Sequence, residues 1–234
     1  MVSAENRPIC EWTYRDIQTL PPDQQKEWRK VCTTELDMLK QRDVFELVNM
    51  LKGCKVNNNH WVFDVKPDGC KHTCLVVKGF SQVKGIDFGQ VFSPVIQFET
   101  VHLMLALASI ENWHIEGLDV RSTYVYGKLD EEIYMKQPKG FAVKGQEHKV
   151  LCLKRALYSL KQAGLAWWET LNESMKDLGF KRLKSDAGIF LYKRKGTTTV
   201  VAIVYVDDAP FCGPDIKTIK EIKAAFMKHW ECRD

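Results

Sequence analysis

The sequence predicts an α+β fold, because segments typical of strands and segments typical of helices both recur along its 234 residues. Apolar residues make up 45% and charged residues 27%, enough apolar material for a substantial core, which excludes a wholly disordered chain. At this length we expect one large domain or two small ones. The net charge of +4 is compatible with binding to a nucleic-acid backbone but does not require it, since the clustering of charges matters more.

Four segments are expected to be helical. After a loose polar lead-in, Pro21-Pro22-Asp23 is a start signal for a helix that reaches about Gln41. The segment Thr100–Asn112 is apolar on most sides and predicts a buried helix. Ala163–Leu178 and Asp215–Asp234 each place apolar residues at helical spacing (Trp167, Leu171, Met175 and Leu178; Ile219, Ile222, Phe226 and Trp230). Trp167 and its neighbour Trp168 are therefore expected in the core rather than as platforms for stacked bases.

Strands are expected in two hairpins and one isolated segment. His60–Val65 and Leu75–Lys78 flank the turn Lys66-Pro67-Asp68-Gly69. Asp186–Tyr192 and Thr197–Val206 are joined at Lys195-Gly196. His114–Val120 is predicted to be a short strand that carries Asp119 near its end.

The tetrapeptide Tyr205-Val206-Asp207-Asp208 is the strongest candidate for a chemical site. It follows the apolar, β-branched run Val200–Val204, and turn signals come after it in Phe211-Cys212-Gly213-Pro214. Two adjacent carboxylates at the tip of a hairpin repel each other unless a cation lies between them, and hard cations such as Mg²⁺ favour oxygen ligands together with substrate phosphates. The alternative is that the Asp-Asp pair simply ends a strand.

A third carboxylate, Asp119, strengthens the metal hypothesis. Three carboxylates from two strand ends can bind two metal ions roughly 3.5–4 Å apart, the arrangement that activates an attacking oxygen and stabilises a leaving oxygen in phosphoryl transfer. A different candidate, Cys70-x-His72-x-Cys74, lacks a second pair of ligands at zinc-finger spacing, so we do not expect zinc there. Eight cysteines without a C-x-x-C pair are typical of reduced thiols in an intracellular protein.

From about Trp28 onward the chain carries an ordered set of motifs. These are His60-Trp61-Val62-Phe63, Val77–Gln82, Gly85-Ile86-Asp87-Phe88, Val91-Phe92-Ser93-Pro94-Val95, Leu118-Asp119-Val120, Glu131–Pro138, Ala156–Ala163 and Tyr205-Val206-Asp207-Asp208. By this ordered set, rather than by one tetrapeptide, the chain resembles the reverse transcriptases of Ty1/copia-type LTR retrotransposons. The resemblance implies polymerase fingers at about 28–98, after a lead-in at 1–27, and a palm at 99–234, with an antiparallel sheet backed by helices.

The resemblance also implies a two-metal nucleotidyl transfer from a dNTP to a primer 3′-hydroxyl on an RNA or DNA template. Asp119 and Asp207, with Asp208 beside them, would hold two Mg²⁺ ions, for which Mn²⁺ can substitute, and the carbonyl of Val120 would complete a metal shell. Tyr124 would crowd a 2′-hydroxyl and favour dNTPs, although a tyrosine after a strand is often only packing.

Three further residues match substrate-contacting positions of the family. Lys161 and Gln162 would approach the template and the incoming nucleotide, and Lys78 is a candidate phosphate contact in the fingers. Basic clusters are further candidate phosphate contacts, or simply solvated surface. They are Lys193-Arg194-Lys195, Lys181-Arg182 with Lys184, and Lys154-Arg155.

Four departures from the family pattern indicate weakened activity. The usual Lys-Ala-Arg-Leu-Val is here His72-Thr73-Cys74-Leu75-Val76, which removes two cations near the triphosphate. His102 stands where many relatives carry Arg, Ser159 replaces a Gly that matters if φ is positive there, and Pro210 on the expected return strand removes a ladder donor and could tilt the hairpin.

Alternatives to a working polymerase remain open at this stage. The chain is expected to be truncated before the thumb and ribonuclease H, and one hypothesis is a decaying copy that retains only nucleic-acid binding. Another is an unrelated metal-dependent nuclease or phosphotransferase built on the same carboxylates. The expected partners are template with primer, dNTPs and other segments of a retrotransposon polyprotein, with no membrane and with replication in cytoplasmic virus-like particles, as in the family.

Overall fold

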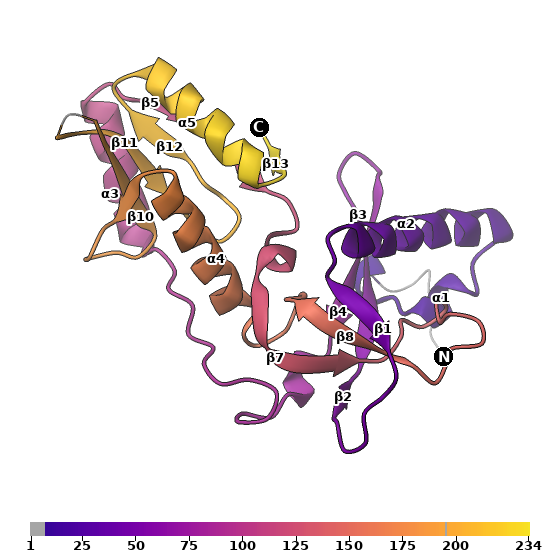
Figure 1. Ribbon diagram of the computed structural model, residues 1–234. Helices are drawn as coiled ribbons and strands as arrows, with labels where there is room; N and C mark the ends of the chain where they lie inside the picture. Colours follow the sequence, from indigo (N-terminus) through magenta and orange to yellow (C-terminus); the bar gives the residue numbers. More distant parts are fainter. Residues whose placement is uncertain (1–7, 195) are drawn as a thin grey trace. The chain divides into compact units, whose positions relative to one another are not determined.

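The computed structural model describes residues 8–194 and 196–234 (Figure 1). The chain forms two compact units that are interleaved along the sequence. The first contains the described residues up to Val91 together with Lys128–Ala163, and the second contains Phe92–Gly127 together with Gly164–Asp234. The sequence had indicated contiguous regions at 28–98 and 99–234. The segment Lys128–Ala163 joins the first unit because its strands pair with strands from the N-terminal part of the chain.

The first unit contains a long helix, a four-stranded sheet and a separate hairpin. The sheet has the order β1-β8-β7-β2, in which only the β2–β7 pair is parallel. The hairpin consists of β3 and β4. The elements are η2 (Ile9–Glu11), α1 (Tyr14–Ile17), α2 (Pro22–Gln41), β1 (Phe45–Val48), β2 (Val56–Asn57), β3 (Asn59–Val65), β4 (Lys71–Val77), η3 (Gly79–Ser81), β7 (Lys128–Met135) and β8 (Val150–Arg155).

Helix α2 and the β3–β4 hairpin confirm the sequence predictions for this unit, except that β4 begins at Lys71 rather than at Leu75. The helix starts at Pro22, whose missing N–H costs nothing in the first turn. Its buried face includes Trp28, whose ring lies 5.3 Å from that of Phe63 in an edge-to-face arrangement. Between β3 and β4, the amide of Gly69 donates to the carbonyl of Lys66 at 2.8 Å, and Gly69 has φ +81°, which glycine adopts without strain.

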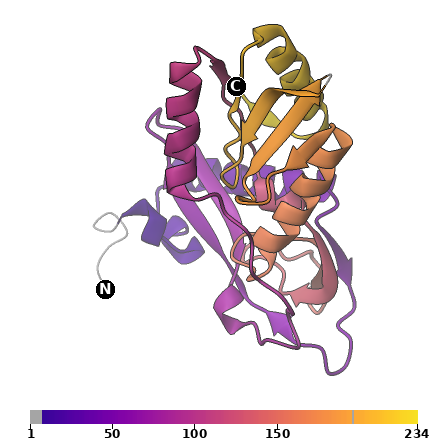
Figure 2. The ribbon, with the colours of Figure 1, turned by 90° about the vertical axis from the view of Figure 1, so that its left-hand side faces the viewer.

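The second unit is a five-stranded antiparallel sheet with helices on both faces (Figure 2). The strand order is β5-β12-β11-β10-β9, and β13 pairs with β6 beside it. The elements are α3 (Phe98–Ile110), β5 (His114–Glu116), β6 (Asp119–Val120), η4 (Thr123–Tyr126), α4 (Ala163–Asp177), β9 (Phe180–Arg182), β10 (Ile189–Arg194), β11 (Thr197–Ile203), β12 (Phe211–Gly213), α5 (Ile216–His229) and β13 (Cys232–Arg233). Together the two units confirm the α+β class.

Successive side chains of β11 point to opposite faces of the sheet, so this unit has a hydrophobic cluster on each face. Val200 and Ala202 pack in one cluster with the apolar faces of α4 and α5, which include Trp167 and Phe226. On the opposite face, Val201 packs with the residues that α3 contributes. The predicted helix at 163–178 is confirmed. The helix predicted at 215–234 is confirmed only as far as His229, because Cys232–Arg233 form the strand β13. Both helices bury the residues expected from their spacing, apart from a partly buried Leu178.

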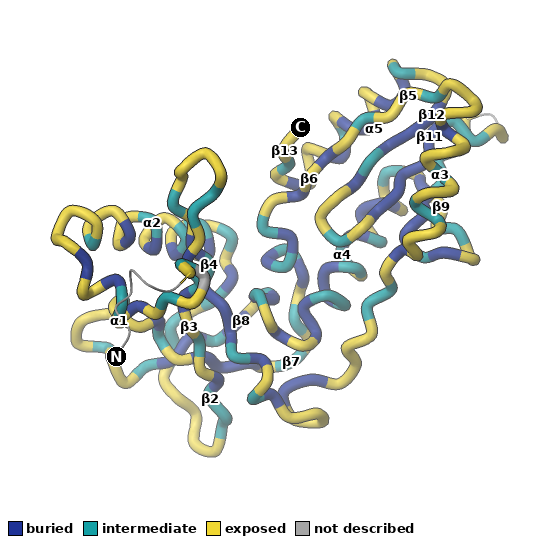
Figure 3. The backbone as a smooth tube through the Cα atoms, turned by 180° about the vertical axis from the view of Figure 1, so that it is seen from behind, coloured by how far each residue is buried: buried dark blue, intermediate teal, exposed yellow. Residues whose placement is uncertain are grey.

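The prediction that the helix over 100–112 is buried was wrong. Of the residues of α3, all of which the structure describes, Ala108 alone is buried. The sheet covers one side of the helix, where Val101, Met104 and Ala108 pack. The other sides are open, and most of α3 is coloured as exposed in Figure 3. Leu103 is 66% and Ile110 75% exposed. An apolar composition on most sides of a helix does not determine how many sides have neighbours.

The return strand of the last hairpin also differs from expectation. Phe211-Cys212-Gly213, taken from the sequence as turn signals, forms strand β12, which lies between β5 and β11 in the sheet. Pro210 lies at its start, where its carbonyl accepts a hydrogen bond of 2.9 Å from the amide of Ile203. Pro210 has no N–H to donate between the strands, as predicted, but β11 and β12 still pair with each other after it. The predicted junction residue Lys195 lies outside the described residues, as do residues 1–7 of the lead-in. Within the described ranges, no helix has both the length and the apolar character needed to cross a bilayer.

Candidate active site

The turn between β11 and β12 carries two of the three predicted carboxylates. It is closed by reciprocal backbone hydrogen bonds: the amide of Tyr205 donates to the carbonyl of Asp208 at 2.8 Å, and the amide of Asp208 donates back at 2.9 Å. Val206 has φ +57° within this turn. Asp207 and Asp208 are both exposed at the tip. The predicted hairpin with an Asp-Asp tip is therefore confirmed.

The third carboxylate, Asp119, lies on the strand next to this turn. Asp119 and Asp208 form an antiparallel bridge, and the amide of Val120 donates to the carbonyl of Asp207 at 2.8 Å. The amide of Ala209 donates to the carbonyl of Leu118 at 2.8 Å, so the turn is tied to the strand on both sides of the bridge. Two segments almost ninety residues apart in the sequence thus bring their carboxylates to the same edge of the second unit.

The electrostatics of this edge reflect the proximity of the three acids. Burial raises the pKa of Asp208, and the neighbouring charges of Asp207 and Asp119 raise it further. Among the described residues, no three His, Cys, Asp or Glu side chains converge closely enough to hold a metal ion. The donor set nevertheless consists of exposed carboxylates on adjacent backbone. Hard oxygen donors of this kind suit Mg²⁺.

Val120 and Tyr124 lie beside the carboxylates. The carbonyl of Val120 accepts a hydrogen bond of 3.0 Å from the hydroxyl of Thr123 and retains a second lone pair. Tyr124 is on η4. Ser122, the residue before this short helix, has a left-handed backbone conformation. Burial raises the pKa of Tyr124, and the charge of Asp207 adds to the shift.

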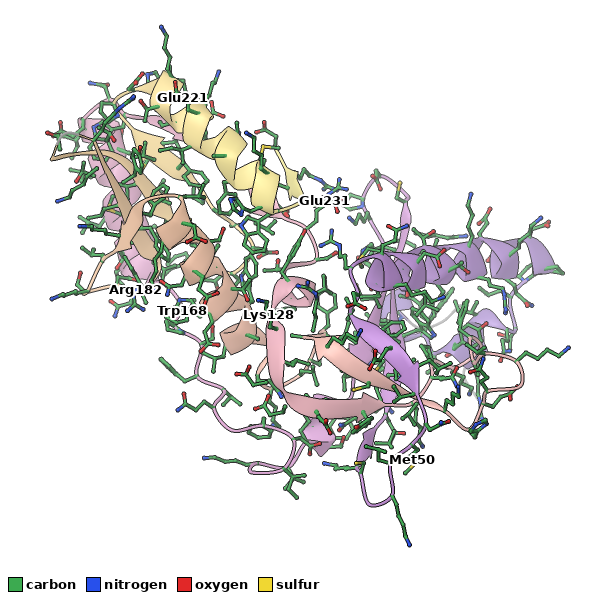
Figure 4. The ribbon with its side chains drawn as sticks, in the orientation of Figure 1. Met50, Lys128, Trp168, Arg182, Glu221 and Glu231 are labelled. Atoms are coloured by element: carbon green, nitrogen blue, oxygen red, sulfur yellow. The ribbon has the colours of Figure 1, made fainter. Side chains whose placement is uncertain are left out.

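Behind the turn lies a mainly apolar cavity of about 160 Å³. Tyr124, Trp167 and Val206 contribute to its wall, together with residues of β10 and α4. Trp167 is buried, as predicted. Trp168, which was also expected in the core, is only half-buried. The guanidinium of Arg182 lies 5.1 Å from the ring centre of Trp168 (Figure 4). Arg182, a member of a predicted phosphate-binding cluster, therefore stacks on an aromatic ring.

The remaining predicted substrate residues belong to the first unit. Gln162 is 4% exposed, and its side-chain nitrogen donates to the carbonyl of Asp87 at 2.9 Å, while its oxygen accepts from Gln82 at 3.1 Å. Lys161 is exposed, with its ammonium 5.7 Å from the ring centre of Phe88. The predicted contact Lys78 is half-buried at the end of β4. The predicted cluster residue Lys154 pairs with Asp43 at 3.1 Å and Glu46 at 3.0 Å.

The departures from the family pattern have definite structural settings. His72 is exposed on β4, and burial of its ring together with Lys66 lowers its pKa, so it is neutral at pH 7. Burial raises the pKa of Cys74 to about 12, so its thiol is neutral as well. Ser159 has φ +66°, the left-handed conformation that its position was suspected to require. His102, on α3, packs edge-to-face on Phe98 at 4.6 Å.

Two features of the site were not predicted. The indole N–H of Trp167 donates to the carbonyl of Val206 at 2.8 Å, a link that no local pattern in the sequence signals. On the far side of β6, the chain end returns as β13, which pairs Arg233 with Asp119. Arg233 therefore borders the same groove as Asp119 and Asp208, and only the pairing of these distant segments places it there.

Comparison with known proteins identifies the family. The family model for reverse transcriptase (RNA-dependent DNA polymerase) matches residues 42–234. The retrovirus-related Pol polyprotein from transposon TNT 1-94 of Nicotiana tabacum is 34% identical over 222 residues, 93% of this chain and 17% of the relative. The Pol polyprotein from transposon RE2 of Arabidopsis thaliana is 31% identical over 229 residues, 93% of this chain and 15% of the relative.

More distant relatives follow the same pattern. The transposon Ty1-H Gag-Pol polyprotein of Saccharomyces cerevisiae is 29% identical over 185 residues, 76% of this chain and 10% of the relative. A solved structure of a foamy viral protease-reverse transcriptase in complex with double-stranded DNA aligns with a TM-score of 0.44 and 13% identity, over 86% of this chain and 28% of that one. The chain spans less than a fifth of the curated polyproteins. It belongs to the reverse transcriptase (RNA-dependent DNA polymerase) family, in its Ty1/copia-type branch.

Proposed function

We propose that this chain is an RNA-directed DNA polymerase domain that extends a primer on an RNA or DNA template. The primer 3′-hydroxyl oxygen would form a bond to the α-phosphorus of a dNTP, the bond from that phosphorus to the β-phosphate oxygen would break, and pyrophosphate would leave. The observation that carries this proposal is the backbone pairing of Asp119 with the Asp207-Asp208 turn. It brings to one exposed edge the three carboxylates that the motifs of the family single out.

Reverse transcriptases use divalent metal ions, and the oxygen donors at this edge suit them. Asp119, Asp207 and Asp208, with the carbonyl of Val120, would hold two Mg²⁺ ions, or Mn²⁺ in their place. When bound, the ions lower the pKa of the attacking hydroxyl and neutralise the triphosphate and the departing pyrophosphate. The mutual repulsion of the three carboxylates supports this assignment, because a cation between them removes it.

The other residues would position the substrates. Tyr124, which lines the cavity behind the turn together with Val206, would lie against the sugar of the incoming nucleotide and disfavour a 2′-hydroxyl. Lys161 and Lys78 would contact phosphate or template as exposed or half-buried cations. The amide of Gln162 is bonded within the first unit, which supports a role in fixing the segment that carries Lys161. Other segments of a longer polyprotein are the proposed partners, as in the relatives.

The residues of β4 favour a second candidate function, nucleic-acid binding without polymerisation. The lowered pKa of the His72 imidazole leaves it without a positive charge at pH 7. Cys74 has no cationic form, and its raised pKa keeps the thiol neutral rather than anionic. Two neutral side chains give a triphosphate less electrostatic hold than two cations do. This candidate predicts salt-sensitive binding to RNA or DNA with no nucleotide incorporation.

Primer extension on poly(rA)/oligo(dT) with Mg²⁺ or Mn²⁺ distinguishes the two candidates. Incorporation of dTTP that disappears in Asp207→Asn would support the polymerase, since the variant keeps the size of the side chain and removes one carboxylate. Circular dichroism of both proteins would establish that the variant is folded. Folded wild-type protein that binds the template–primer but adds no nucleotide would refute the polymerase proposal and leave the binding function.

A further inference from the structure

Val206, the residue between Tyr205 and Asp207, has an unfavourable backbone conformation. Its φ of +57° lies in the left-handed region, where a β-branched side chain is a genuine outlier. A residue in this conformation persists only when the surrounding structure holds it there. The two hydrogen bonds between Tyr205 and Asp208 close the turn around Val206, but they do not bond the Val206 carbonyl itself.

Trp167 supplies the bond to that carbonyl. Its indole N–H donates to the oxygen of Val206 at 2.8 Å, from a side chain that is 3% exposed. The ring is fixed in turn, because it packs against Trp230 at 5.0 Å and Tyr126 at 6.1 Å. The backbone of α4 at Trp167 also lies so close to Gly127 that any side chain at residue 127 would overlap this helix.

We propose that Trp167 is a positioning residue of the polymerase site, which holds Val206 in the left-handed conformation and so fixes the direction of the two carboxylates that follow. This inference rests on the proposed polymerase function. A change in the φ of Val206 would displace the backbone that follows it, including the Asp207 carbonyl, which accepts from the amide of Val120. The turn and the Asp119 strand would then lose register, and with it the geometry that metal binding and in-line transfer require.

A matched control separates this role from ordinary core packing. Trp230 belongs to the same aromatic cluster and is 7% exposed, but its indole nitrogen has no hydrogen-bond partner among the described residues. Trp167→Phe and Trp230→Phe therefore remove similar volume from one cluster. Only the first removes a hydrogen bond to the turn, so a difference between the two variants reports on that bond.

The experiment measures the turn directly and then its effect on the reaction. We expect Trp167→Phe to speed hydrogen exchange of the Asp208 amide at least tenfold over Trp230→Phe, because that amide is bonded across the turn. In primer extension we expect kcat to fall at least tenfold in Trp167→Phe with an unchanged KM for template–primer. Trp230→Phe keeps an aromatic ring against Trp167 and the hydrogen bond from Trp167 to the turn, so it should lower kcat much less than Trp167→Phe does.

Rescue by a second substitution, at Val206, distinguishes a positioning role of Trp167 from a purely structural one. Glycine adopts φ near +57° without strain, so Val206→Gly in the Trp167→Phe background should restore most of the exchange protection at Asp208. Equal exchange and equal kcat in the two tryptophan variants would overturn the proposal, as would failure of the glycine to restore protection. If the wild type itself incorporates nothing while the exchange difference persists, the polymerase proposal fails and the hold of Trp167 on the turn stands.

Discussion

The carbonyl oxygen of Ser159 lies at the position that a Cβ atom on Gly79 would take. A Cβ added to Gly79 would overlap this oxygen, so only glycine is accommodated there. Ser159 turns its carbonyl in this direction while its own φ is +66°. The neighbouring bonds hold the two segments together: the amide of Val77 donates to the carbonyl of Tyr158 at 3.1 Å, and the amide of Lys161 donates to the side chain of Gln82 at 2.8 Å.

Ser159→Gly is expected to stabilise the protein by about 1 kcal/mol, because a non-glycine residue in the left-handed region costs roughly 1–2 kcal/mol. The serine side chain is exposed, so little packing is lost. Urea unfolding measures the change. Ser109→Gly, at an exposed position inside α3, is the control and should destabilise by about 0.5 kcal/mol. Equal signs for the two substitutions would contradict a strained Ser159.

Glu35 is expected to make stability depend on pH. Burial raises its pKa from 4.5 to about 7, although the amide of Leu75 donates to its carboxylate at 3.4 Å. The folded state therefore binds the proton more tightly than the unfolded state. This contribution to stability is fully present below pH 4.5 and is lost as the pH rises through 7.

Glu35→Gln removes this titration. We expect no change in unfolding free energy at pH 4, a gain that grows between pH 4.5 and 7, and a plateau above pH 7 of at most about 3 kcal/mol. Chemical unfolding across this pH range gives the curve. Asp37→Asn, at an exposed position on the same helix, should show no such rise. A gain that is equal at pH 4 and pH 8 would show that ionisation of Glu35 is not its source.

Because most sides of α3 face solvent, we expect the helix to accept charged side chains at its exposed positions. Leu103→Lys combined with Ile110→Lys should change the unfolding free energy by less than about 0.5 kcal/mol, because both side chains are already largely in solvent. Ala108→Leu, on the covered side, should cost about 1–3 kcal/mol by overpacking. Thermal or urea unfolding compares the two. Severe destabilisation by the double lysine variant would mean that another part of the protein covers this face.

Tyr124→Val should relax sugar selection if the polymerase proposal holds. With the ring removed, the ratio of rNTP to dNTP incorporation is expected to rise at least tenfold, which corresponds to about 1.4 kcal/mol in relative transition-state energy. Single-nucleotide extension with dTTP and UTP measures the ratio. Tyr126→Phe, on the same short helix, removes only a hydroxyl that accepts from the amide of Glu231, and should leave the ratio unchanged. An unchanged ratio in Tyr124→Val would assign the tyrosine to packing alone.

The sequence by itself determined those features that depend on neighbouring residues in the chain. The start of α2 at Pro22, the turn at Gly69 and the apolar spacing of α4 each follow from local conformational preferences or periodicity. The Asp207-Asp208 hairpin was predicted for the same reason, since a β-branched run leads into two carboxylates. The ordered motifs were sufficient to identify the family.

The tertiary structure alone decided which faces are covered and which distant segments meet. The apolar composition of α3 could not show that the sheet covers one side and leaves Ile110 in solvent. Nor could the sequence place the Trp167 indole against Val206, or the Ser159 carbonyl against Gly79. Such contacts join residues tens of positions apart, and their existence depends on the packing of whole elements rather than on any local preference.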